Sequence, residues 1–185
     1  IKNYFCLPDC IMKNAIIIRK AHKKDMPFVL ALIKELASYE KAPKEVKIRL
    51  KELERDGLGK EKVYDCFVAE AVGRTKGGLG RKIISPNSEF STPKLIVGMA
   101  LYYTKYSTWK GKCIYLEDII VTESMRRGGI GRKLFQAVIQ AAKKMKARKL
   151  EWQVLNWNKP AINFYKKYST VFDNEWINCK LIFEK

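Results

Sequence analysis

The sequence predicts an α/β protein, and three features of the chain lead to this fold class. Short apolar runs rich in β-branched residues alternate with segments whose apolar residues recur at helical spacing. The order of these segments combines hairpin-like strand pairs with strand–helix–strand units. The chain has 185 residues, enough for one domain with a substantial core. We expect residues 15–185 to form this domain and residues 1–14 to precede it as an extension.

The first half of the chain predicts two strands that flank two helices. An isoleucine-rich run at 15–19 is typical of a short buried strand. Asp25 offers an N-cap for an amphipathic helix at 26–38, in which apolar residues recur every three or four positions. A more charged helix is expected at 44–55, ending near two glycines, and a strand at 63–72.

The second half predicts a loop, a hairpin and a longer helix. Glycines, prolines, hydroxyl residues and basic residues at 73–93 favour a long exposed insertion. Strands at 94–104 and 112–122 should form a hairpin, followed by a helix at 129–148 with Leu134 on its buried face. The end of the chain predicts a strand at 150–156, a helix at 158–168, and one or two strands at 171–184.

The composition favours a cytoplasmic protein without a metal site. No apolar run approaches the roughly 18 residues of a membrane span, and the first ten residues lack the pattern of a signal peptide. The five cysteines are odd in number and scattered, and they match no familiar zinc spacing with His22, the single histidine. The net charge of +18 favours polyanions, but basic residues spread along the whole chain are typical of solvated surfaces. Nucleic acid is therefore an unlikely partner.

The segment from Tyr115 to Lys133 carries the clearest chemical signal. An apolar strand with two acids runs into a turn of arginines and glycines, and then into a helix. Glycines allow the backbone to approach a ligand closely and to point several N–H groups at it. The helix N-terminus adds partial positive charge. This arrangement predicts a binding site for a pyrophosphate group.

Four stretches of sequence resemble the GNAT acetyltransferases, and in particular the polyamine and thialysine acetyltransferase branch. Arg126-x-x-Gly129-x-Gly131 matches the acetyl-CoA motif of that family. YSTWKGKCIYLEDIIV at 106–121, IKELASYEK at 33–41 and NWNKPAINFYKK at 156–167 match the narrower branch. The resemblance covers roughly residues 16–176, apart from the insertion at 73–93. It implies a GNAT fold, a mixed and strongly bent sheet flanked by helices, with acetyl-CoA in the cleft between two splayed central strands.

The resemblance also implies roles for individual residues. Tyr165 corresponds to the acid that protonates the departing thiolate, and Glu117 to the acid that accepts the amine proton. The residues implied at acetyl-CoA are Ile119, Ile120, Val121, Arg126, Arg127, Gly128, Gly129, Ile130, Gly131, Arg132, Asn158 and Tyr165. The residues implied at the amine are Tyr39, Glu40, Glu117, Asp118, Trp152 and Glu175. Glu175 is the weakest of these matches, because the family's glycine is missing from this part of the chain.

Several of these residues also have purely structural interpretations. Asn158, followed by Pro160, is a good helix cap, and Tyr165 has the setting of a core aromatic residue. Glu117 and Asp118 are adjacent, so in a regular strand they point to opposite faces. Only one of them then faces a given cleft, unless a bulge or a splay of the strands intervenes.

The expected function is transfer of acetyl from acetyl-CoA to the primary amine of a small molecule, directly in a ternary complex. The resemblance implies a polyamine or a thialysine-like amino acid as the acceptor, and a homodimer. The positive net charge of the chain slightly favours an acceptor with few positive charges. Two alternatives stay open: acetylation of a lysine in a protein or peptide, and a non-catalytic module that binds acetyl-CoA or nucleic acid.

Overall fold

The computed structural model describes residues 15–72 and 95–183, which form two compact units. The first unit extends to Trp152 and the second begins at Gln153. The predicted extension at 1–14, with Cys6 and Cys10, and the predicted insertion at 73–93 lie outside the described residues. The first unit contains β1 (Ala15–Lys20), η2 (Lys23–Asp25), α1 (Met26–Tyr39), η3 (Pro43–Glu45), α2 (Leu50–Leu58), β2 (Asp65–Val72), β3 (Leu95–Ser107), β4 (Gly111–Val121), η4 (Glu123–Met125), α3 (Ile130–Lys144) and β5 (Leu150–Glu151). The second contains α4 (Lys159–Tyr165) and η5 (Lys166–Tyr168).

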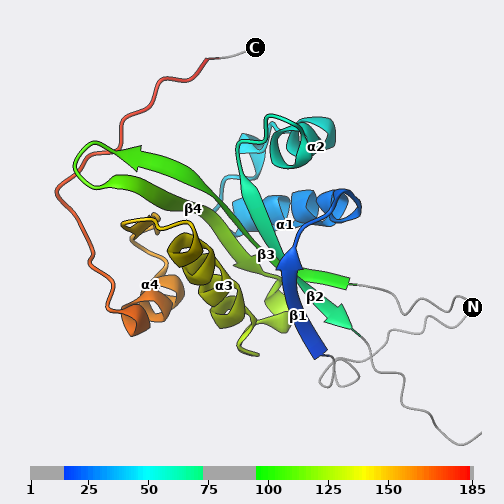
Figure 1. Cartoon of the computed structure of the whole chain (residues 1–185). Helices are drawn as coiled ribbons and strands as arrows, with labels where there is room; N and C mark the ends of the chain where they lie inside the picture. The colour runs from blue at the N-terminus through cyan, green and yellow to red at the C-terminus, as the bar shows by residue number, and fades with distance from the viewer. Residues whose placement is uncertain (1–14, 73–94, 184–185) are drawn as a thin grey trace, which may run out of the picture. The chain divides into compact units, whose positions relative to one another are not determined.

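The first unit is built on a mixed sheet of five strands in the order β1-β2-β3-β4-β5 (Figure 1). The pairs from β1 to β4 are antiparallel, and β4 pairs with β5 in parallel. The link between β4 and β5 is the helix α3, as a parallel connection requires. This confirms the α/β fold class and the hairpin expected from the sequence, whose strands are β3 and β4.

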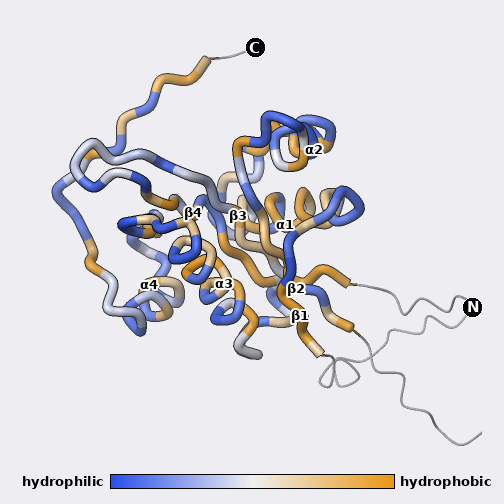
Figure 2. The backbone as a smooth tube through the Cα atoms, viewed as in Figure 1, coloured by the Kyte–Doolittle hydropathy of each residue, from blue (hydrophilic) through white to orange (hydrophobic). Residues whose placement is uncertain are grey.

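Helices cover both faces of this sheet. Helices α1 and α2 pack together on one face and α3 packs on the other, as Figure 1 shows. Val29 and Leu32 of α1 are buried in the hydrophobic core beneath α1, together with Leu53 of α2. Leu134 and Val138 of α3 are fully buried on the opposite face. Figure 2 shows hydrophobic residues along the central strands and hydrophilic residues on the outer surfaces of the helices.

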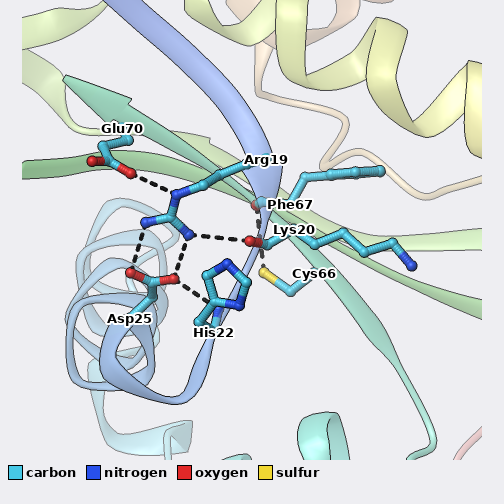
Figure 3. Close-up of polar contacts among 7 residues, drawn as sticks. All are labelled: Arg19, Lys20, His22, Asp25, Cys66, Phe67 and Glu70. Atoms are coloured by element: carbon cyan, nitrogen blue, oxygen red, sulfur yellow. Dashed lines mark hydrogen bonds and ion pairs between the residues drawn. The ribbon is translucent and has the colours of Figure 1, made fainter. Parts of the chain in front are cut away.

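A buried ion-pair network ties β1 and β2 to the start of α1 (Figure 3). The guanidinium of Arg19 donates to both carboxylate oxygens of Asp25, at 2.6 and 2.9 Å, and to Glu70 at 2.5 Å. Asp25 and Glu70 are 3% and 4% exposed. Burial opposes ionisation of Asp25, but the bonds from Arg19 and from the backbone N–H of His22 hold the pKa of that carboxyl below its usual range.

Asp25 occupies the N-cap position of α1, as expected, but its side chain makes no capping bond to that helix. It accepts instead from the N–H of His22 and from Arg19, because a guanidinium within reach is a stronger partner for a buried carboxylate than a backbone amide. The residue still marks the start of the helix, since α1 begins at the next position.

Three expected elements differ in extent from those of the structure. The charged helix α2 begins only after Arg49, whose backbone N–H donates to the Glu52 carboxylate at 2.9 Å and thus closes the N-terminus there. Strand β5 has two residues rather than seven, because pairing with β4 covers only that length. No strand forms at 171–183, where every residue is exposed, so the backbone groups of this segment are free to bond to water. No helix among the described residues is long and apolar enough to cross a membrane.

We expect Arg19→Met to destabilise the fold by about 3 kcal/mol, because it leaves two buried carboxylates without their shared cation. The free energy of unfolding, measured in urea at pH 7, tests this expectation. Arg49→Met is the matched control, since Arg49 is exposed and also pairs with a carboxylate. Equal effects of the two substitutions would contradict a structural role for the Arg19 network.

Candidate active site

A bulge in β4 brings two acidic side chains to the face of the sheet that α1 covers. Leu101 of β3 lies opposite Asp118, whereas the next residue, Tyr102, lies opposite Leu116, so Glu117 is the extra residue. Leu101 belongs to the core beneath α1, which places Asp118 on that face. The regular alternation that would have separated Glu117 from Asp118 is therefore interrupted at this point.

Two tyrosine rings lie beside this acidic pair on the same face of the sheet. Tyr103 packs against the core beneath α1, and its ring lies 5.4 Å from that of its cross-strand neighbour Tyr115. Burial, with the charge of Glu117 and a hydrogen bond to it, raises the pKa of Tyr103 to about 12. Tyr103 is therefore a neutral hydroxyl at physiological pH, and Glu117 lies within its reach.

The end of α1 contributes a third carboxylate. Glu40 follows the last residue of α1, and burial raises its pKa above the usual value. Burial, followed by the charges of Glu117 and Glu40, raises the pKa of Asp118 to about 6. Asp118 thus lies within electrostatic range of both Glu117 and Glu40, and we call these three side chains the acidic cluster. A cluster of this kind favours a cationic ligand, because a cation lowers the repulsion among the carboxylates.

The segment between β4 and α3 has the backbone geometry of an anion site. Arg127 and Gly129 both adopt left-handed conformations, with φ of 66° and 77°. Gly129 is the N-cap of α3, so the first N–H groups of the helix lack partners within it. A Cβ placed on Gly129 would meet no atom within 4 Å. The backbone is therefore open to a ligand here, as a pyrophosphate site at a helix N-terminus requires.

The first arginine of this segment turns back onto α1. The Arg126 Nε donates to the carbonyl of Val121 at 2.9 Å, and its guanidinium lies over the Tyr39 ring at 5.1 Å. Its Nη2 is 3.9 Å from Oε1 of Glu35, which also accepts from the backbone N–H of Glu123 at 3.0 Å. The side chain of Arg126 thus contacts α1 and β4, although this residue is exposed, as are Arg127 and Arg132.

The residues of β4 that were expected to bind acetyl-CoA lie along an edge without a strand partner. Pairing between β4 and β5 ends at Tyr115, while pairing with β3 continues to Val121. From Leu116 onward, the backbone groups on the β5 side of β4 have no ladder partner among the described residues. The side chains of Ile120 and Ile130 are buried in the core, so only their backbone groups can contact a ligand.

The remaining expected site residues lie in different surroundings. In the first unit, the Trp152 ring makes an edge contact with Phe135 of α3, at 5.2 Å between centroids. In the second unit, Asn158 caps α4 by accepting from the N–H of Ala161 at 3.2 Å, as its structural interpretation predicted. Tyr165 is buried at the end of α4, and Glu175 is exposed. The roles assigned to these residues stay predictions.

Sequence reasoning missed two contributors to the site, Tyr103 and Glu35. Glu35 lies four residues before Tyr39, so both side chains share one side of α1, and this spacing was the available signal. Tyr103 gave no such signal, because its place beside Glu117 depends on the register of the hairpin and on the bulge. Among the described residues, no three His, Cys, Asp or Glu side chains gather as a metal site.

Several known acetyltransferases have sequences similar to this chain. Residues 86–169 match the model of the Acetyltransferase (GNAT) family. Thialysine N-epsilon-acetyltransferase of Bos taurus is 42% identical over 151 residues, which cover 82% of this chain and 81% of that protein. Spermidine/spermine N(1)-acetyltransferase-like protein 1 of Homo sapiens is 34% identical over 148 residues, 80% of this chain and 19% of that protein.

Solved structures show the same fold at lower identity. An aminoglycoside acetyltransferase from an uncultured soil metagenomic sample, in complex with sisomicin, has a TM-score of 0.65 and 16% identity. It covers 91% of this chain and 97% of its own. The ribosomal-protein-alanine N-acetyltransferase of Brucella melitensis has a TM-score of 0.60 and 19% identity, with coverage of 91% and 100%. The curved five-stranded sheet is thus the GNAT fold that the motifs implied, and by its sequence as well as its fold the chain belongs to the GNAT family of acetyltransferases.

Proposed function

We propose that the protein transfers acetyl from acetyl-CoA to the primary amine of a small molecule. The observation that carries this proposal is the placement of two complementary sites, one at the bulge of β4 and one in the segment that joins β4 to α3. The acidic cluster of Glu40, Glu117 and Asp118 suits an ammonium group, and the left-handed turn at Arg127 and Gly129 suits a pyrophosphate. Acetyl-CoA, which GNAT enzymes generally use, supplies the acetyl group as a thioester.

Each residue of the acidic cluster has a distinct part in the proposed chemistry. An ammonium is not a nucleophile, so a base must remove a proton before the nitrogen lone pair can attack. Glu117 is exposed and acts as this base, directly or through a water molecule. Asp118 and Glu40 are less exposed, and their charge holds the cation in place.

The remaining steps use backbone groups of β4 and the hydroxyl of Tyr165. N–H groups near Ile119, on the edge of β4 without a strand partner, would hold the carbonyl oxygen of the acetyl group. Tyr165, in the place of the family's tyrosine, would donate its proton to the sulfur as the carbon–sulfur bond breaks. The ammonium loses two protons: the first passes to Glu117 before attack and is later released to solvent. The second leaves the nitrogen as the intermediate collapses and restores the Tyr165 hydroxyl that has protonated the sulfur, so the protons balance.

Direct transfer, without an acetylated enzyme, fits the cysteines of the described chain. Burial raises the pKa of the Cys66 thiol to about 12, which leaves almost no thiolate to act as a nucleophile. Cys113 is fully buried. Cys179, in the second unit, is exposed, but its segment contains no histidine to activate it.

The acceptor that we propose is a thialysine-like amino acid or a polyamine. Relatives named thialysine N-epsilon-acetyltransferase support the first, and a relative named as spermidine/spermine acetyltransferase-like supports the second. The net charge of +18 repels cations at long range, which favours an acceptor with few positive charges. A cytoplasmic location and a homodimer belong to the same proposal and rest on the family resemblance.

We expect purified protein to release free thiol from acetyl-CoA with at least one small amine in a panel of thialysine, lysine, putrescine, spermidine and spermine. Glu117→Gln and Tyr165→Phe should each lower kcat by about 10²–10⁴-fold, the usual contribution of one acid or base. Tyr106→Phe is the control, because Tyr106 is an exposed tyrosine on the hairpin. Transfer only to a lysine-containing peptide added to the same panel would refute the small-amine proposal.

The pH dependence of kcat/KM for the amine should reflect titration of the acidic cluster. Asp118 has a raised pKa of about 6, so it gains a proton as the pH falls below 6 and the cluster loses one negative charge. A primary amine stays protonated in this range, so the attraction between site and substrate weakens. We expect kcat/KM for the amine to fall about tenfold between pH 7 and pH 5.

Asp118→Asn tests this origin, because the amide cannot titrate. The variant should have a lower kcat/KM at pH 7. Its plot of kcat/KM against pH should also lack the fall near pH 6, which we call the acidic limb. Asp56→Asn, which alters an exposed carboxylate, should keep the limb. An unchanged acidic limb in Asp118→Asn would assign the titration to another group.

The turn at the start of α3 can be tested with a matched pair of glycines. Gly129 and Gly111 have φ of 77° and 81°, and a Cβ on either would meet no atom within 4 Å. Alanine at each position should therefore cost a similar stability, about 1–2 kcal/mol. Only Gly129→Ala should weaken binding of coenzyme A, by roughly tenfold, since its Cβ obstructs an approaching phosphate. Calorimetric titration with coenzyme A compares them, and equal affinities would count against a coenzyme site at this turn.

A further inference from the structure

We propose that Glu35 is a positioning residue that holds the coenzyme-binding turn against α1. This inference deepens the proposed function and rests on it. Glu35 lies in the middle of α1, outside the motifs of the coenzyme site. Its carboxylate nevertheless makes contacts with the segment that joins β4 to α3.

The contacts of Glu35 reach the two sides of η4, which lies in that segment. Oε1 of Glu35 accepts the backbone N–H of Glu123, at the start of η4, at 3.0 Å. The same oxygen is 3.9 Å from Nη2 of Arg126, just after η4. We call this pair of interactions the Glu35 contact. Because one carboxylate oxygen meets both groups, the contact fixes the distance between the helix and the turn.

Arg126 extends the Glu35 contact to β4 and to the end of α1. Its Nε donates to the carbonyl of Val121, the last residue of β4, at 2.9 Å. Its guanidinium also lies over the ring of Tyr39, at 5.1 Å from the centroid. The guanidinium is thus fixed from three directions, by an acid, a carbonyl and an aromatic face. An arginine held in this way orients the backbone that follows it, and that backbone is the left-handed turn at Arg127.

The exposure of the cation and the backbone donor distinguish this contact from an ordinary ion pair. The acids are similarly exposed, 34% for Glu35 and 25% for Glu54 of the pair Lys23–Glu54, but Arg126 is 35% exposed and Lys23 79%. The bond from Glu123 is made by a backbone N–H, which has no side-chain entropy to lose. Both features favour a defined geometry over a mobile pair.

The Glu35 contact also links the proposed coenzyme site to the proposed amine site. Tyr39, which receives the Arg126 guanidinium, is followed directly by Glu40 of the acidic cluster. One helix therefore carries a carboxylate that faces the amine side and another that secures the coenzyme side. The helix keeps the two sites at a constant separation, which a reaction between two bound substrates requires.

The test compares coenzyme binding with catalysis in Glu35 variants of the full chain. Glu35→Ala removes both interactions and should raise the Kd for coenzyme A and the KM for acetyl-CoA by roughly tenfold, the size expected for loss of one hydrogen bond to a charged group. The value of kcat at saturating acetyl-CoA should stay within about twofold, because Glu35 contacts no reacting group. Glu35→Gln keeps an acceptor for the Glu123 N–H, so it should restore most of the affinity.

Glu54→Gln is the matched control, since it removes a surface carboxylate from an ion pair of similar length, 3.6 Å, on α2. It should leave both Kd and KM unchanged. A Glu35→Ala protein that binds coenzyme A as the original chain does would overturn the proposal. So would equal losses in kcat and in coenzyme affinity accompanied by a lower melting temperature, because that pattern indicates general damage to the fold. Titration with coenzyme A requires no acetyl transfer, so it decides the role of Glu35 even if no amine in the panel is acetylated.

Discussion

One extra residue in β4 determines what the rest of the sheet can present to a ligand. Before Glu117, the side chain of Tyr115 lies on the face covered by α1; after it, Asp118 and Ile120 lie on that same face. Without the bulge, the alternation of a regular strand would turn the side chain of Asp118 toward α3. A different set of β4 side chains would then pack into the core beneath α1. The buried position of Ile120 and the acidic cluster therefore depend on the same local irregularity.

Beyond its pairing with β5, the backbone of β4 has a strand partner on one side only within the described part of the chain. Pairing with β5 stops two residues before the bulge, while β3 continues to support β4 as far as Val121. A strand supported on one side only can keep its shape and still offer N–H and carbonyl groups on the other. Glu117 and Asp118 thus lie on the strand itself, and the left-handed turn follows its end, after η4. Catalytic groups placed on a strand keep their separation better than groups placed on independent loops.

The sequence predicts those parts of the site that depend on local patterns. Helical spacing in the sequence predicts α1 and α3, and the glycines of the turn predict an anion site. The bulge could not be predicted, because every residue from Tyr115 to Val121 suits a regular strand and the irregularity arises from pairing with β3. The pairing of Arg19 with Glu70 could not be predicted either, since Glu70 is 51 residues away in the chain. The strands expected at 171–183 failed for the same reason, because strand formation depends on a partner that local sequence does not specify.

The electrostatics of the molecule combine a strongly basic chain with a small acidic site. A net charge of +18 acts over long distances only weakly at physiological salt, where screening sets in beyond roughly 8 Å. Burial raises the pKa of Asp118 to about 6, and the charges of Glu117 and Glu40 within that distance add to the effect. A cation bound beside Asp118 would reduce this repulsion. The exposed side chains of Arg127 and Arg132 place positive charge in the segment that follows the C-terminal end of β4. Negative charge on the strand and positive charge just after it suit the ammonium and the pyrophosphate of the proposed reaction.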